Sequence, residues 1–281
     1  MTAHFRRRAA AAGFPYAHMA FSPSGFHVAI LSARALVVHE VDVTNFSRAA
    51  LVVDAGGVRW VALHLHAQSA VQRRAEATHV AEIVSSYSKA GLPVVVLGDF
   101  NSLSPRDAEC HRTGFTVARL VAGSGDKERG AALAEKFLCR SDDAGCAGQA
   151  VVVKSNLWAI DYTPLTTLAA VGLFDLLAAH DNANHCPASY PTAAVAAAAG
   201  AGIDGHDDNG GVPLRIDFAL ANRAFLRLFP QTKCAVGGAA LDFARDGSAR
   251  GFFDATTQEK ALLHEMVAAS DHLPLVCDTA E

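Results

Sequence analysis

No run of apolar residues in this chain is long enough to cross a bilayer, and no two cysteines have the C-x-x-C spacing of a zinc ribbon. A membrane-spanning helix needs about 20 apolar residues, and zinc ribbons need such cysteine pairs. An excess of basic residues is also missing, since the net charge is −4 and the pI is about 6.3. Acidic residues are absent from the start of the chain, where the first is Glu40. These absences exclude a membrane span, a zinc ribbon and a uniformly basic nucleic-acid-binding protein.

The composition is that of a globular chain with a large core, because 51% of its 281 residues are hydrophobic and 19% are charged. This length suffices for one large α/β domain or two small ones. We interpret the six cysteines as reduced thiols, which favours an intracellular compartment, cytoplasmic or nuclear, while their even number leaves disulfides open. The Arg- and Ala-rich, acid-poor start is also typical of an organellar transit peptide. We prefer a helix of the fold there, because it runs directly into a strand.

The spacing of apolar residues predicts strands in the first part of the chain, then a helix and another strand. The expected order is strands at 27–32 and 35–42, a hairpin of strands 50–54 and 58–66 around Gly56-Gly57, a helix at 70–90 and a strand at 94–98. Further on we expect helices at 131–138, 165–179 and 257–268, and strands at 212–220 and 273–278. Asp175 in the second of these helices is expected to be a cap or a salt-bridge partner, and residues 193–211 a low-complexity surface loop. This order predicts a mixed sheet covered by helices.

Two polar residues follow the strand at 94–98, in the sequence Gly98-Asp99-Phe100-Asn101-Ser102. Ligand and metal sites in layered α/β proteins gather at the C-terminal ends of strands. Residues i and i+2 of a strand point to one side, so Asp99 and Asn101 can converge on one ion or one phosphate. Asp and Asn also start turns by bonding to their own backbone, and this alternative stays open.

Three further motifs accompany this one, namely LHL at 63–65, RIDF at 215–218 and SDHLP at 270–274. Four such motifs in this order resemble the endonuclease/exonuclease/phosphatase superfamily, which includes deoxyribonucleases, abasic-site endonucleases, inositol-polyphosphate 5-phosphatases and neutral sphingomyelinases. The resemblance implies a single domain over residues 1–281, built as a four-layer α/β/β/α sandwich of two mostly antiparallel sheets flanked by helices. It also implies a divalent-metal-dependent phosphoesterase that hydrolyses a P–O bond by metal-assisted attack of water.

The resemblance assigns metal and nucleophile roles to acidic and amide groups. Asp99 would orient the attacking water and contact the metal, Asn101 would bind a phosphate oxygen and the metal, and Asp271 would be a metal ligand. Such hard oxygen ligands suit Mg²⁺ or Mn²⁺.

The resemblance gives the histidines roles in proton transfer and in contact with the phosphate. His272 would contact the scissile phosphate or the attacking water, with Asp217 holding its ring in one tautomer, because an imidazole needs a partner on its other nitrogen. His64 would donate to the leaving group. His66 lies on the same strand face and competes for this role, but His64 occupies the motif position.

One departure from the family pattern concerns the metal. The family normally carries a metal-binding Gln-Glu upstream, preceded by an Asn on the first strand, and neither is present. We therefore expect an N-terminally truncated domain that holds Mg²⁺ weakly. Three interpretations stay open: an active phosphodiesterase or phosphatase, a degenerate member that binds a phosphate compound or a partner without turnover, and an unrelated α/β domain. The substrate could be nucleic acid, a phosphorylated small molecule or a lipid, and the oligomeric state is open.

Overall fold

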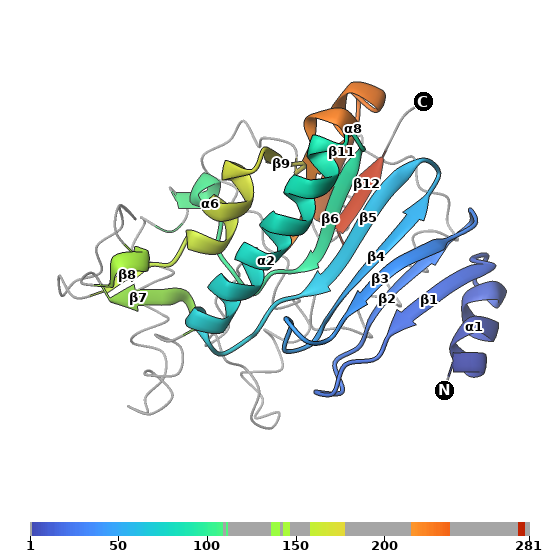
Figure 1. Ribbon diagram of the computed structural model, residues 1–281, viewed down its shortest axis with the longest axis horizontal. Helices are drawn as coiled ribbons and strands as arrows, with labels where there is room; N and C mark the ends of the chain where they lie inside the picture. The colour runs from blue at the N-terminus through green and yellow to red at the C-terminus, as the bar shows by residue number, and fades with distance from the viewer. Residues whose placement is uncertain are drawn as a thin grey trace, which may run out of the picture.

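A six-stranded mixed sheet forms the centre of the protein, whose structure is a computed structural model (Figure 1). The structure describes residues 2–108, 111, 136–140, 143–146, 158–177, 215–236 and 275–278. The strands, in spatial order, are β3 (Val37–Asp42), β4 (Ala49–Ala55), β5 (Val58–His64), β6 (Val94–Asp99), β10 (Asp217–Asn222) and β9 (Leu173–Asp175). Neighbouring strands run antiparallel except β5 and β6, which are parallel. This parallel pair brings the C-terminal ends of β5 and β6 to the same edge of the sheet.

Helices cover one face of this sheet, as the front of Figure 1 shows. They are α2 (Ala70–Lys89), which connects β5 to β6, and α6 (Thr163–Ala170). Ser69 caps the start of helix α2, because its side chain accepts a hydrogen bond from the Gln72 backbone N–H. Val80 and Val84, one turn apart on α2, pack in one buried cluster with alternate residues of the strands. Burial of these apolar faces is the main source of stability for the layer.

Two small sheets cover the opposite face. One consists of β1 (Tyr16–Ala20) and β2 (Val28–Ser32), and the other of β11 (Lys233–Val236) and β12 (Leu275–Asp278). Helix α1 (Thr2–Ala11) lies beside β1, and α8 (Arg223–Leu228) follows β10. Strands β7 (Leu138–Arg140) and β8 (Trp158–Ile160) form a further antiparallel pair. Two short 3-10 helices are η1 (Pro105–Asp107) and η2 (Ala144–Cys146). The layered α/β fold with mostly antiparallel sheets is confirmed.

Two expected helices differ from the structure. The helix expected at 165–179 ends at Ala170, after which Gly172 takes a φ of 85° and the chain turns into β9. The helix expected at 131–138 is described only from residue 136 onward, where residues 136 and 137 are helical and Leu138 already begins β7. In both places a short apolar run of strand residues fits the helical spacing as well. Asp175 is the salt-bridge partner that we expected, since its Oδ2 lies 2.7 Å from Arg215 Nη1.

Other expectations lie outside the described residues, namely the loop at 193–211 and the helix at 257–268. The strand expected at 212–220 is described from residue 215 onward, where β10 begins at Asp217. The helix expected at the start of the chain is α1. Within the described part, no helix is both long and apolar enough to cross a membrane.

The interpretation of the cysteines as reduced thiols is wrong for those that the structure describes. Cys139 and Cys146 form a disulfide, with their Cα atoms 5.9 Å apart, and Cys234 is also disulfide-bonded. Spacing in the sequence does not reveal such a bond, because it depends on how β7 and η2 approach each other. The intracellular compartment stays a prediction and loses the support that reduced thiols would have provided.

Candidate active site

Three predicted site residues lie side by side at one edge of the central sheet. His64 ends β5 and pairs in register with Asp99, which ends β6, and Asp99 pairs in turn with Asp217 at the start of β10. Residues directly opposite each other on neighbouring strands point to the same face of a sheet. His64 Nε2 lies 3.0 Å from Asp99 Oδ2. The fold thus brings an imidazole and two carboxylates, separated by up to 153 positions in the sequence, to one face and one row.

Gly98 allows this close approach of β5 and β6. Its φ is 137°, a conformation that side chains rarely adopt. A Cβ atom at Gly98 would collide with the carbonyl oxygen of Leu63 on β5. The glycine in the motif is therefore needed for the spacing between His64 and Asp99.

Asn101 locks the carboxylate of Asp99 in place. Its backbone N–H donates to Asp99 Oδ1 at 2.7 Å, and its side-chain Nδ2 donates to Asp99 Oδ2 at 3.1 Å and to the Leu65 carbonyl at 3.0 Å. Asn101 is buried and has a φ of 46°, a left-handed conformation that Asn tolerates better than most residues. The turn that the sequence left open as an alternative is therefore present, and it holds Asp99 at the edge of the sheet.

His66 has a structural role in the turn before α2, unlike His64. Its Nδ1 accepts hydrogen bonds from the backbone N–H groups of Ser69 at 2.8 Å and Gln68 at 3.2 Å, at the start of α2. Burial lowers the pKa of His66, and the Glu76 carboxylate opposes this shift. His66 thus secures the turn between β5 and α2, while His64 lies in the row with Asp99.

Two buried charged residues of α2 brace the segments that flank β4 and β5. Glu76 accepts hydrogen bonds from the backbone N–H of Ser47 at 2.7 Å and that of His66 at 2.6 Å. Arg73 donates to the carbonyl of His66 at 2.8 Å and also to that of Lys136. Burial lowers the pKa of Arg73 to about 10, although nearby carboxylates favour its charge. These contacts fix the start of β4 and the end of β5, where His64 lies.

Arg48 and Phe26 also border the row, and the motifs gave no sign of them. The Arg48 guanidinium lies 4.3 Å from the centre of the Phe26 ring, and this ring meets His64 edge-on with centroids 6.1 Å apart. Burial lowers the pKa of Arg48, whereas the carboxylates of Asp99 and Glu76 act in the opposite direction. A single Arg ahead of an apolar strand carries no signal in the sequence, because only the fold brings it near Asp99.

The arginine of the RIDF motif is structural in the described part of the chain. Arg215 is buried, and its Nε lies 2.9 Å from Asp107 Oδ2 while its Nη1 contacts Asp175. Burial raises the pKa of Asp107, and the charge of Arg215 opposes this shift. These ion pairs connect η1, β9 and the start of β10, and they position Asp217 two residues further on.

The described residues do not by themselves complete a metal site. Asp99 and Asp217 supply two carboxylates, but both oxygens of Asp99 already accept hydrogen bonds from Asn101. No group of three or more His, Cys, Asp or Glu side chains that could hold a metal occurs among the residues placed by the structure. The remaining predicted residues, Asp271 and His272, lie outside the described ranges.

Solved structures of two nucleases and a phosphatase are similar to this chain in fold. It is similar to a 3′-5′ exonuclease (NExo) from Neisseria meningitidis, with 14% identity, a TM-score of 0.52, and coverage of 98% of this chain and 82% of that one. It is also similar to an AP endonuclease from Archaeoglobus fulgidus, with 13% identity, a TM-score of 0.51, and coverage of 98% and 83%. A 3′ phosphatase NExo from Neisseria, bound to a product DNA hairpin, has 16% identity, a TM-score of 0.50, and coverage of 98% and 82%.

No family model matches the sequence, and no curated protein matches it either. At these identities the likeness concerns the fold. The chain shares its fold with an exonuclease and an AP endonuclease, as the resemblance of the four motifs led us to expect.

Proposed function

We propose that this protein is a phosphoesterase that hydrolyses a P–O bond at the row formed by His64, Asp99 and Asp217. The observation that carries the proposal is the register that aligns these three side chains on one face at the C-terminal ends of β5 and β6. Hydrolysis of a phosphoester needs a positioned water, neutralised phosphate charge and a stabilised leaving oxygen. A carboxylate, an imidazole and a nearby guanidinium supply groups for each of these tasks.

The contacts of each residue support one role in the proposal. Asp99, held by Asn101, would orient the attacking water and accept its proton. His64 faces Asp99 through Nε2, which leaves Nδ1 as the ring nitrogen that would turn toward the leaving group. Arg48 would contact a phosphate oxygen, because guanidinium groups match phosphate geometry.

The C-terminal motif adds the remaining parts of the proposal. Asp217 would orient the ring of His272, and His272 would contact the scissile phosphate. Dependence on Mg²⁺ or Mn²⁺ belongs to the proposal as well, with Asp99, Asn101 and Asp271 as the candidate ligands. Because the described residues alone do not complete a metal site, we assign no step of the reaction to the ion.

Nucleic acid is the substrate class that we propose to test first, since one structure of similar fold contains a DNA product. Inositol polyphosphates and sphingomyelin are the other members of the panel. Abasic DNA and single-stranded RNA distinguish a phosphodiesterase that acts on duplexes from one that acts on single strands.

The test is hydrolysis of bis(p-nitrophenyl) phosphate and of this panel, with Mg²⁺, Mn²⁺ or EDTA. We expect Asp99→Asn to lower kcat/KM by about 100-fold or more, the usual size of a lost acid–base group. Asp54→Asn is the matched control, because Asp54 is also a strand carboxylate but pairs with Arg59 near the opposite end of the β4–β5 hairpin. A loss of less than about tenfold for Asp99→Asn would contradict the assignment.

A second candidate function is binding of a phosphate compound without turnover. It is favoured by the hydrogen bonds from Asn101, which already engage both oxygens of Asp99. Isothermal titration with Mg²⁺ and with a non-hydrolysable phosphoester separates the two candidates. Binding without hydrolysis on every substrate of the panel would establish the second candidate and reject the first.

A further inference from the structure

Phe26 is an exposed aromatic side chain that borders the row of His64, Asp99 and Asp217. It is 57% exposed, the largest value for any Phe, Tyr or Trp among the residues that the structure describes. A single exposed apolar side chain needs no explanation by itself. This ring, however, meets the ring of His64 edge-on, with centroids 6.1 Å apart and planes at 74°. It is therefore placed to contact whatever His64 acts on.

Arg48 holds the Phe26 ring from one side. Its guanidinium carbon lies over the ring, 4.3 Å from the centre, where the electrons of the ring attract the positive charge. Arg48 directly precedes Ala49 of β4, which pairs in register with His64. Because Arg48 covers one face of the ring and 57% of the side chain is exposed, the opposite face is open to a ligand.

The turn that carries Phe26 is fixed by its own hydrogen bonds. The Ser22 backbone N–H donates to His27 Nδ1 at 3.1 Å, and the Gly25 N–H donates to the Ser22 carbonyl at 3.1 Å. Gly25 has a φ of 84°, which glycine adopts without strain. The ring is thus held in place before a ligand arrives, which reduces the entropic cost of binding.

The surroundings of Phe26 favour a flat ligand over an alkyl chain. The ring contacts a guanidinium and an imidazole, both of which are polar groups that lose hydration under an alkyl chain. A nucleobase instead stacks on the open face of the ring and keeps its polar edge in water. Every base has such a face, so stacking on aromatic side chains is a general way to bind unpaired bases.

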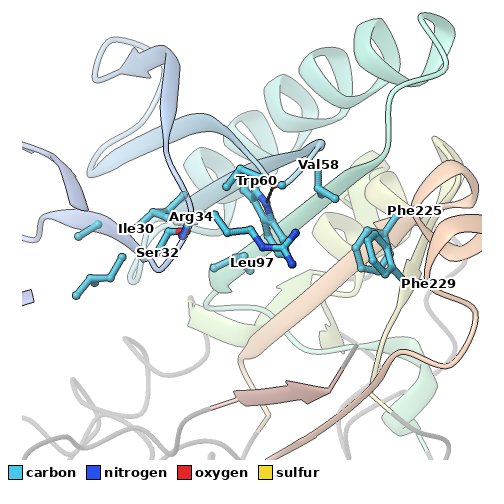
Figure 2. A pocket seen from close by; sticks show the side chains of 12 residues that line it. Ile30, Ser32, Arg34, Val58, Trp60, Leu97, Phe225 and Phe229 are labelled. Carbon is cyan, nitrogen blue, oxygen red and sulfur yellow. Dashed lines mark hydrogen bonds between the residues drawn. The ribbon is translucent and has the colours of Figure 1, made fainter. Parts of the chain in front are cut away.

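A cavity on the same face of the sheet is too far from the row to hold this base. It has a volume of about 440 Å³, and Trp60 and Leu97 lie in its lining, with Phe225 of α8 on one side (Figure 2). Trp60 lies four residues before His64 on β5, which corresponds to about 13 Å along the strand. Only one sugar separates a base from its phosphate, so a base next to the cut reaches Phe26 rather than Trp60.

We propose that Phe26 stacks on an unpaired base of the nucleoside that leaves when the P–O bond breaks. This inference rests on the proposed function, in which His64 donates to the leaving oxygen. In that hydrolysis the water oxygen bonds to phosphorus, the bond to the leaving oxygen breaks, and the leaving oxygen takes a proton. The substrate is thus a nucleic acid that is single-stranded at the cut, because a paired base is not free to stack on the ring.

A thymidine decamer with one abasic tetrahydrofuran residue at its centre tests the proposal within one molecule. Mass spectrometry of the products gives the cleavage rate at each linkage, and the leaving residue is the one that ends in a free hydroxyl. We expect the linkage whose leaving residue is abasic to be cut about tenfold more slowly than the others, the usual effect of one lost stacking contact.

Two variants of Phe26 separate stacking from support of His64. Phe26→Leu should bring the rates at all linkages within about threefold of each other, whereas Phe26→Tyr should keep the tenfold difference. A mere loss of support for His64 would slow every linkage equally and leave their ratio unchanged. Both variants are expected to fold, because the side chain is 57% exposed. Phe21→Leu is the matched control, since Phe21 is 42% exposed in the same turn but meets His27 edge-on.

Several results would overturn this inference and leave the phosphoesterase assignment intact. They are equal rates at all linkages in the unmodified chain, a slow cut only where the abasic residue keeps the phosphate, and an unchanged ratio in Phe26→Leu. Activity on duplex DNA, inositol polyphosphates or sphingomyelin but not on single strands would overturn it as well. Hydrolysis of no substrate in the panel would instead reject the proposed function, and the inference with it.

Discussion

Replacement of Glu76 by glutamine would test how much its two hydrogen bonds, beside the row of His64, Asp99 and Asp217, contribute to stability. Glu76 is buried, and its two oxygens accept hydrogen bonds from the backbone N–H groups of Ser47 and His66. A glutamine keeps one acceptor oxygen but turns an amide N–H₂ toward the second donor. Charge-assisted hydrogen bonds contribute about 1.5–3 kcal/mol each, and an unsatisfied buried N–H costs about 1–3 kcal/mol. We therefore expect Glu76→Gln to lower the free energy of unfolding by about 2–4 kcal/mol.

The assay is urea unfolding followed by tryptophan fluorescence, analysed for the midpoint and the slope. Glu82→Gln is the matched control, because Glu82 lies on the same helix with a side chain that is 70% exposed. This control should change the stability by less than about 0.5 kcal/mol. If the two variants lose the same stability, or if Glu76→Gln loses less than about 1 kcal/mol, the two hydrogen bonds are not important contacts and the reasoning fails.

Three further predictions concern single residues. Gly98→Ala should cost about 3 kcal/mol or prevent folding, whereas Gly91→Ala, where φ is 74° but no atom lies within 4 Å, should cost only about 1 kcal/mol in urea unfolding. Burial lowers the pKa of His111 to about 4 from its ordinary 6.5, so the unfolded chain takes up a proton first and stability should fall between pH 6.5 and pH 4 by up to about 3 kcal/mol. In His111→Gln the loss of stability over this pH range should be clearly smaller, although His66, whose pKa burial also lowers, still contributes to it; an unchanged profile would refute the assignment. Arg48→Met should raise KM for a phosphoester more than it lowers kcat, and an unchanged KM would remove Arg48 from phosphate binding.

Strands β2 to β6, β10 and β12, with their order along the chain, could be predicted from the sequence because their signals are local. The alternation in 58–64 and the apolar run in 94–97 give β5 and β6, and the glycine pair at 56 and 57 gives the turn of the hairpin. The positions of Asp99 and His64 at the strand ends followed from the same pattern. The motifs then related Asp217, far away in the sequence, to the same site.

The features of the fold and of the candidate site that could not be predicted depend on contacts between segments that are distant in the sequence. No periodicity indicates that Glu76 on α2 binds the backbone of Ser47 and His66, or that the Arg48 side chain lies over Phe26. The short strand β9 could not be separated from the preceding helix, because three residues are too few for a pattern. Such features become visible only when the sheet aligns its strands.

The bond between Cys139 and Cys146 has a practical consequence for anyone who makes this protein. It closes a small ring that contains Asp143, whose carboxylate binds Arg74 on α2 at 2.7 Å. In a chain-entropy description, a ring of eight residues stabilises the fold by about 2.5 kcal/mol. Material from the cytosol of a bacterial host and material exported to its periplasm should therefore differ in thermal tolerance, and dithiothreitol in a purification buffer should erase the difference.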